Sequence, residues 1–460
     1  MDTDNKLVKY GYIYDVCSGF QFDLNSVLKK EHKGVSEGHL CDHNCTSECG
    51  NYDCPAAFTR NKDIVPESVM SFADVRQTLS VAKQGLRIMN HHFLDDIFPK
   101  HVRDFGIPRE IAASIKERLA KDTVELNLFG GNPELHPRFL DIITLAQQLG
   151  WKVTTTTTGK KFLYDDKFSK EFLRTLPDLL AISADDYENV EEFIRLVRMP
   201  PKTLKMYWQK ANPLYGQRKK AYESVYVAKF AQRQDHFCPI LFNIVIHPGN
   251  ISYIDRLITT LHEYFPKALL NPYPAQSSFS FGSIAWEEKD MVLLEKCIDA
   301  MIKRHIAQAD KKNKTFVPRL PYWLALKSIY RTVKKPQELM GFISGYTAWT
   351  CFRKSGAGRY LQTTSAAITR RNKFKVGGHP GCFWNNTTVT DKQRHIWDLH
   401  PVDIAKHLLR GKTALARRAK KRCPGCLMPR LMFDGLSIES GLHPVLLPAY
   451  LTLRKKYIGF

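Results

Sequence analysis

The stretch VELNLFGGNPELHPRFLDIITLAQQLGWKVTTTTTGKKFL, residues 124–163, sets the pattern of the whole chain. Residues 123–129 and 151–158 are short runs of strand-forming side chains. Between them, residues 138–150 carry apolar side chains at helical spacing and end at a glycine, the residue type that most often closes a helix. The stretch therefore predicts a β-α-β unit.

The same alternation continues along the chain. An opening strand is expected at residues 7–15, and further elements follow up to residue 274: strands 178–184, 239–247 and 267–274, and helices 170–177, 215–234 and 253–265. Six strands joined by helices predict an α/β fold with a parallel sheet, either doubly wound or closed into a full or partial barrel. In each architecture the functional loops leave the carboxyl ends of the strands.

Four unusual loops follow these predicted strand ends. The first contains a run of cysteines, and the others read GGNPELHP at 130–137, TTGK at 157–160 and SADD at 183–186. Paired glycines after a strand either turn the chain sharply or let a ligand approach bare backbone groups, and the other three loops beside them favour the ligand. We therefore expect a ligand site at the carboxyl edge of the sheet.

The cysteine run HLCDHNCTSECGNYDCP, residues 39–55, holds Cys41, Cys45, Cys49 and Cys54. A disulfide knot, a structural zinc site and an iron-sulfur cluster each use such a run. The first residues lack a secretory pattern and no apolar run is long enough to span a membrane, so a cytoplasmic protein without a membrane partner is expected. That compartment, with an odd total of eleven cysteines, favours metal binding over disulfides.

The other cysteines form a second group and a set of isolated positions. The second group lies in the C-terminal third and consists of Cys382, Cys423 and Cys426, with Cys351 a candidate to complete it. The isolated positions, expected to be core or incidental, are Cys17, Cys238 and Cys297.

The chain has a formal net charge of +22, and residues 410–422, RGKTALARRAKKR, hold seven basic side chains in thirteen positions. Such a cluster fits a polyanionic partner such as RNA, because Lys and Arg neutralise phosphates. It fits equally well a solvated helix face in a protein that binds anionic cofactors or acidic peptides. The charge alone leaves both interpretations open.

Residues 124–163 resemble the second and third strands of radical S-adenosylmethionine (radical SAM) enzymes, which typically carry a Gly-Gly-Glu-Pro loop, a Leu-His-Pro turn and a strand ending in Thr-Asn-Gly. Residues 179–193 and 243–257 are similar to the fourth and fifth strands of that family. The resemblance implies a partial (β/α)6 TIM-like barrel that holds a 4Fe-4S cluster through three cysteines, with S-adenosylmethionine on the fourth iron.

The resemblance also implies which residues hold these groups. The cluster ligands would be Cys41, Cys45 and Cys49. The family spaces its cysteines by three and then two residues whereas this loop has three and then three, so Cys54 is an alternative ligand in place of Cys49 or Cys41. The residues implied to meet S-adenosylmethionine are Gly130, Gly131 and Asn132 with the loop-stiffening Pro133, at the methionine amino group, and Thr157 and Ser183, near the carboxylate or ribose. Four cysteines at these spacings also fit a closed zinc site, which leaves no open position for catalysis.

The C-terminal stretch 350–384, together with RCPGCLMPR at 422–430, resembles the auxiliary iron-sulfur modules called SPASM or twitch. The spacing from Gly377 to Cys382 is the shared Gly-x4-Cys element. One auxiliary 4Fe-4S cluster is implied, held by Cys351, Cys382, Cys423 and Cys426. The Cys-x2-Cys pair at 423–426 alone also fits a zinc knuckle or a redox dithiol.

We therefore expect a core barrel over residues 1–290, a helical bridge over 291–340 and an iron-sulfur module over 341–460. The implied enzyme cleaves S-adenosylmethionine reductively, with electrons from a donor such as ferredoxin or flavodoxin, and abstracts hydrogen from a substrate. We rank a peptide or protein substrate first, small-molecule oxidation second and tRNA third. The alternative from another class is a non-catalytic, zinc-stabilised nucleic-acid-binding protein, which explains the charge and the cysteines but not the shared strand-end face.

Overall fold

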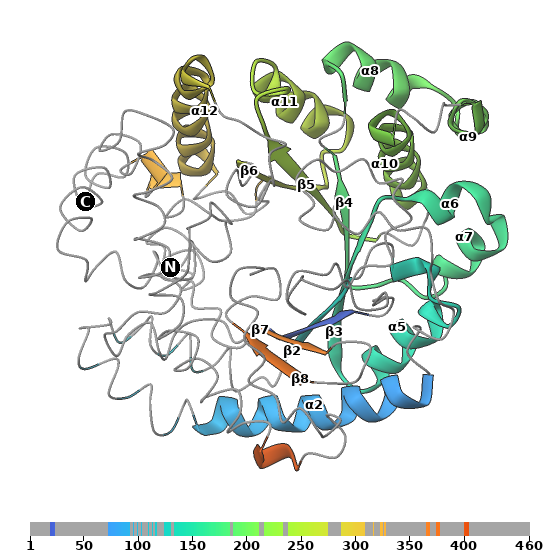
Figure 1. Cartoon of the computed structure of the whole chain (residues 1–460), viewed down its shortest axis with the longest axis vertical. Coiled ribbons are helices and arrows are strands. Elements are labelled where there is room, and N and C mark those ends of the chain that lie inside the picture. The colour runs from blue at the N-terminus through green and yellow to red at the C-terminus, as the bar shows by residue number, and fades with distance from the viewer. Residues whose placement is uncertain are drawn as a thin grey trace, which may run out of the picture.

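The computed structural model describes residues 19–23, 72–92, 124–129, 133–184, 187–210, 216–232, 238–274, 287–308, 365–368, 374–377 and 400–403, together with single positions at 95–116 and 316–327. Helices and strands alternate through most of these residues (Figure 1). The strands are β1 (Gly19–Asp23), β2 (Val124–Phe129), β3 (Trp151–Thr157), β4 (Leu179–Ser183), β5 (Ile240–Ile246), β6 (Leu269–Pro274), β7 (Ser365–Ile368) and β8 (Phe374–Gly377). The helices are α2 (Phe72–His92), the 3-10 turn η4 (Pro133–Leu135), α5 (Phe139–Gln148), α6 (Lys160–Tyr164), α7 (Asp166–Phe172), α8 (Val190–Arg198), α9 (Pro201–Lys210), α10 (Gly216–Gln232), α11 (Ile254–Tyr264) and α12 (Glu288–Ala307).

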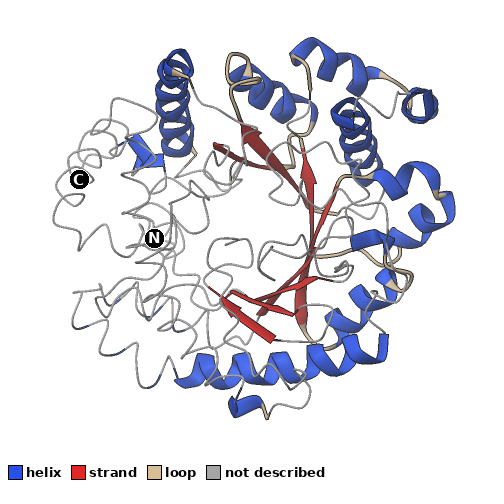
Figure 2. Ribbon diagram, viewed as in Figure 1, coloured by secondary structure: helices blue, strands red, loops and turns tan. Residues whose placement is uncertain are grey.

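The described strands form one sheet in the order β6-β5-β4-β3-β2-β1-β7-β8. Strands β1 to β6 are mutually parallel and adjacent in chain order. A doubly wound sheet would reverse its strand order at a switch point, whereas a barrel keeps neighbours in sequence. The strands follow a curved path with the helices arranged along its outer side (Figure 2). The prediction of a parallel α/β fold is confirmed, and the strand order selects the barrel-type arrangement.

Most elements after residue 123 match the sequence pattern, but the helix predicted at 170–177 lies earlier, as α7 at Asp166–Phe172, because the Asp165 side chain caps its start. The predicted helix 138–150 is α5, and Gly150 follows it with a φ of 76°, as a closing glycine should. The first strand differs, because β1 begins at Gly19 and the predicted strand 7–15 lies outside the described residues.

The C-terminal segment also contributes to the sheet. Strand β7 pairs in parallel with β1, and β8 pairs antiparallel with β7. Both strands lie within 341–460, the range predicted as a separate module, and they extend the same sheet. The domain boundaries stay predictions.

The two faces of the sheet have different neighbours. The Phe242 ring on β5 lies 5.3 Å from that of Phe265, which ends α11, so Phe242 points toward the helices. Side chains alternate along a strand, and paired residues on adjacent strands share a face. Ile182 and Thr157, which share the row of Phe242, therefore lie on the helix-facing side. The inner face carries the intervening residues.

Among the described residues, no helix has both the length and the apolar character needed to cross a membrane.

Candidate cofactor and substrate site

The carboxyl edge of the sheet is the starting point of the predicted loops. In the parallel pair β1 and β2, Asp23 is aligned with Phe129, so both strands end at the same level. The chain continues from Asp23 toward the cysteine run and from Phe129 into the paired glycines. The cysteines at 41–54 and residues 130–132 lie outside the described residues, as do the four C-terminal cysteines.

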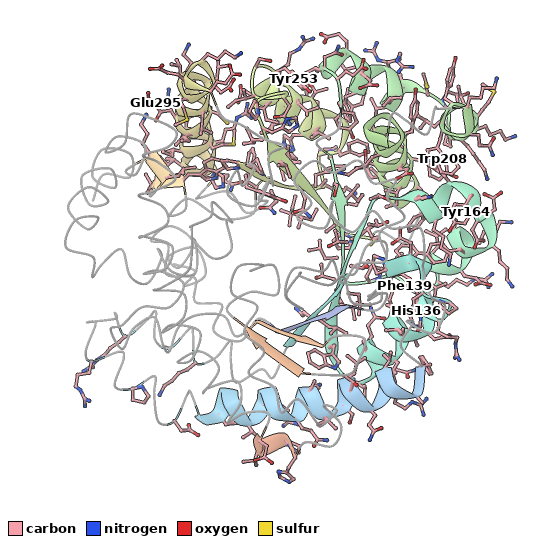
Figure 3. The ribbon with its side chains drawn as sticks, viewed as in Figure 1. His136, Phe139, Tyr164, Trp208, Tyr253 and Glu295 are labelled. Carbon is pink, nitrogen blue, oxygen red and sulfur yellow. The ribbon has the colours of Figure 1, made fainter. Side chains whose placement is uncertain are left out.

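The turn after the glycines is well defined from Pro133 onward. Pro133 is buried, and its carbonyl accepts a 3.0 Å hydrogen bond from the His136 amide. His136 is also buried, and its Nδ1 accepts a 3.1 Å bond from the Arg138 amide just before α5 begins (Figure 3). These hydrogen bonds therefore fix the conformation of the segment that precedes α5.

A buried carboxyl group lies within this turn. Oε1 of Glu134 accepts a 2.6 Å hydrogen bond from the Thr157 hydroxyl, and the Glu134 carbonyl accepts a 2.9 Å bond from Nζ of Lys161. Oε2 of Glu134 is buried without a hydrogen bond to any part of the described chain. Burial raises the pKa of Glu134 to about 7, against the bond from Thr157 and the charge of Lys161. The carboxyl group is therefore held largely protonated below neutral pH.

A second buried carboxyl group lies nearby on α10. Oε1 of Glu223 accepts a 2.9 Å hydrogen bond from Nε1 of Trp208 on α9. Trp208 is labelled in Figure 3. Burial raises the pKa of Glu223 to about 7, and the charge of Glu134 contributes in the same direction. Hydrogen bonds from Trp208 and Thr158 oppose this rise.

Gly159 lies between the two residues with buried carboxyl groups, Glu134 and Glu223. Its amide donates a 2.8 Å hydrogen bond to the Thr157 hydroxyl, and its φ of 93° lies in the left-handed region. A Cβ atom at this position would lie 2.5 Å from the backbone oxygen of Glu223. Glycine is thus required both by the backbone angle and by the approach of α10. The loop after β3 is held between the turn after β2 and α10.

The structure separates the two predicted contacts Thr157 and Ser183. Thr157 lies on the helix-facing side, and its hydroxyl already has both Glu134 and the Gly159 amide as partners. Ser183 is paired with Asn243, which follows Phe242 on β5 and hence points to the inner face. The two predicted contacts therefore lie on opposite faces of the sheet.

Two asparagines extend the row of Ser183 on the inner face. Asn243 is paired with Ser183 on one side and with Asn271 on the other. Nδ2 of Asn271 donates a 2.8 Å hydrogen bond to Oδ1 of Asn243. Asn271 is only 7% exposed, and its Oδ1 has no hydrogen-bond partner among the described residues.

The described cysteines behave as core residues. Cys238 and Cys297 are buried free thiols, and burial raises the pKa of each to about 12. Both side chains belong to the hydrophobic core of the described residues. This confirms the prediction for these two positions, while Cys17 lies outside the described residues. Within the described part of the chain, no group of three or more His, Cys, Asp or Glu side chains could hold a metal ion.

The residues that the sequence interpretation missed are polar, and three of them, Glu134, Glu223 and Asn271, are buried, whereas Asn243 is half-buried. Glu134 stands in the quoted loop but was not chosen, and Glu223, Asn243 and Asn271 belong to elements interpreted only as helix or strand. The asparagines had a detectable signal, because they interrupt apolar runs at positions that alternation places on the face of Ser183. Glu223 had none, since a helical glutamate is ordinarily exposed.

The chain has weak similarity to several solved structures. SuiB of Streptococcus suis bound to precursor peptide SuiA matches with 11% identity and a TM-score of 0.42, covering 90% of this chain and 70% of that one. SuiB bound to S-adenosylmethionine matches with 12% identity and a TM-score of 0.42, covering 87% and 67%. A histidine-tagged anSMEcpe with bound AdoMet matches with 10% identity and a TM-score of 0.44, covering 96% and 98%.

No family model and no curated protein matches the chain. TM-scores below 0.5 do not define a shared fold, so the architecture is taken from the strand order of this chain.

Proposed function

We propose that this chain is a radical SAM enzyme. The observation that carries the proposal is the alignment of strand ends, since β1 and β2 are neighbours and end in register. The cysteine run follows the first of these strands and the paired glycines follow the second. A cluster loop and a cofactor loop that leave adjacent parallel strands start at one edge of the sheet.

The residues at this edge fit the cofactor in chemical type. S-adenosylmethionine presents hydroxyl, carboxylate and amino groups, and these suit the Ser183 hydroxyl on the inner face and the backbone of Gly130, Gly131 and Asn132. Cys45 and two of Cys41, Cys49 and Cys54 would hold the 4Fe-4S cluster. When bound, the cluster supplies the electron that cleaves the sulfonium and generates the radical that abstracts hydrogen. The chain itself binds, orients and shields these groups.

The auxiliary site and the electron supply are part of the same proposal. Cys351, Cys382, Cys423 and Cys426 would hold a second 4Fe-4S cluster, and a cytoplasmic donor such as ferredoxin or flavodoxin would deliver the electrons. A peptide or protein is the first choice of substrate and a small molecule the second.

An RNA substrate is the other candidate that a specific observation favours, namely the net charge of +22 and the basic segment 410–422. Affinity for an unstructured RNA oligonucleotide that falls steeply as salt is raised would support it. The alternative hypothesis, a zinc-stabilised nucleic-acid-binding protein, predicts the same fall in RNA affinity with salt. The two hypotheses differ in the bound metal, which is zinc in the alternative and iron in the enzyme.

Metal analysis after anaerobic reconstitution tests the proposal. About four irons per chain are expected for the catalytic cluster and about eight if the auxiliary site is filled, each with matching sulfide. The C238A variant is the control, because Cys238 is a buried thiol that should not affect iron uptake. Stoichiometric zinc that iron does not replace would contradict the enzyme.

A further inference from the structure

The polar row on the inner face consists of Ser183, the implied contact to S-adenosylmethionine, and two further residues, Asn243 and Asn271. It runs across neighbouring strands through Ser183, Asn243 and Asn271, at the register positions given by the strand pairing. Neighbouring strands are about 4.8 Å apart, so the Asn243 and Asn271 positions lie one and two strands beyond Ser183. The asparagine pair is therefore beside the implied cofactor contact rather than part of it.

The hydrogen bonding of the pair is incomplete. Asn271 uses one amide hydrogen on Asn243, and its own Oδ1 has no partner among the described residues although the residue is only 7% exposed. If both amides were flipped, Asn271 would accept from Asn243 and its amino group would lack a partner instead. In either orientation one polar group of the Asn271 side chain makes no hydrogen bond to the described residues. Buried polar groups in native proteins normally have a hydrogen-bond partner.

The surroundings of the pair indicate what kind of group would complete it. On the same face, Asn243 is flanked along β5 by Leu241 and Val245, and Asn271 is flanked along β6 by Leu269 and Tyr273. A few polar groups within an apolar wall are typical of a site that orients an organic ligand. All members of the row are uncharged, so the row offers no cation to a phosphate or carboxylate.

We propose that Asn243 and Asn271 form a substrate subsite that recognises a neutral amide, such as a peptide group, through its N–H and C=O. The unpaired Oδ1 of Asn271 accepts from the ligand N–H, and the partly exposed Asn243 supplies the second contact. Identification of this ligand as the substrate rests on the proposed function, and it favours the peptide over RNA. The subsite itself requires neither iron nor S-adenosylmethionine.

The test uses the whole 460-residue chain without cofactors and two small probes. Saturation-transfer NMR would compare N-acetylalanine N-methylamide, an amide probe, with dimethyl phosphate, a phosphodiester probe. We expect the wild type to bind the amide probe and the N243L/N271L variant to lose at least about fivefold of that affinity. The Q147L variant is the matched control, because Gln147 is an exposed side-chain amide on α5 that bonds the Leu176 carbonyl.

Stability measurements separate the subsite from a structural role. Replacing both members of an incompletely bonded pair by apolar groups of similar shape should leave the melting temperature unchanged or raise it. A clear fall in melting temperature, or amide binding that survives in N243L/N271L, would overturn the proposal. Preferential binding of dimethyl phosphate that the double variant abolishes would overturn it as well, in favour of a phosphate site. If the wild type bound the amide probe but did not cleave S-adenosylmethionine, the result would contradict the proposed function and leave the amide subsite standing.

Discussion

The Thr157 hydroxyl at the end of β3 donates a 2.6 Å hydrogen bond to Glu134 in the turn that follows β2. This bond ties together two loops that the sequence assigned independently to cofactor binding. The Gly159 amide donates to the same hydroxyl, so the connection continues into the loop before α6. Glu134 therefore links the turn after β2 to the end of β3.

The first prediction concerns the pH dependence of stability. The pKa of Glu134 is about 7 in the folded protein and 4.5 ordinarily, so between these values the folded state retains a proton that the unfolded chain has lost. Raising the pH through this window should lower the free energy of unfolding, by up to about 3 kcal/mol for this group. Above pH 7 its contribution should stay constant.

The E134Q variant isolates that effect. Its free energy of unfolding in urea, relative to wild type, should increase from pH 5 to pH 7, because the amide cannot ionise. The E171Q variant is the control, since the Glu171 side chain is 48% exposed. A difference between E134Q and wild type that does not vary with pH would show that Glu134 is not titrating as a buried acid.

The second prediction compares two glycines with left-handed backbone angles. In G159A the new Cβ would meet the backbone oxygen of Glu223 at 2.5 Å, whereas in G150A it would meet the flexible end of Lys83. Both variants bear the backbone penalty of about 1 to 2 kcal/mol, and G159A should lose at least about 2 kcal/mol more. Thermal unfolding of the two variants gives the comparison, and equal losses would mean that α10 does not press on Gly159.

The third prediction separates the roles of Ser183 and Thr157. S183A should bind S-adenosylmethionine about two- to tenfold more weakly, the loss of one hydrogen bond, with little change in stability. T157V should instead lose about 1 to 3 kcal/mol of stability, because it leaves Glu134 and the Gly159 amide without their partner. Calorimetric titration and urea unfolding measure the two effects. Weaker S-adenosylmethionine binding by T157V and lower stability of S183A would instead indicate that the cofactor lies on the helix-facing side.

The fourth prediction addresses the third cluster ligand. Cys49 and Cys54 are alternatives in the same loop, so replacement of the true ligand should abolish iron uptake at the catalytic site and replacement of the other should not. Iron content of C49A and C54A after reconstitution decides between them. Full iron content in both variants would show that neither Cys49 nor Cys54 is an essential ligand.

The sequence predicted the fold well where local patterns report on burial. The run from 124 to 274 alternates strand and helix so regularly that β2 to β6 follow from side-chain periodicity alone. β1 was not predicted, because GFQFD is short and its position is fixed by pairing with β2 and β7, which are remote in sequence.

The site was only partly predictable for a related reason. Motif spacing identifies loops, and alternation could have shown that Thr157 and Ser183 face opposite sides of the sheet. The Glu134, Gly159 and Glu223 assembly depends on how α10 packs against a loop about sixty residues earlier, which no local pattern encodes.

The most direct test of the central claim is the formation of 5'-deoxyadenosine by the anaerobically reconstituted chain with S-adenosylmethionine and a strong reductant. The account predicts 5'-deoxyadenosine from the wild type and from C238A, and none from C45A, because Cys45 belongs to each ligand set considered. Bound zinc without 5'-deoxyadenosine from the wild type, or undiminished 5'-deoxyadenosine from C45A, would contradict it.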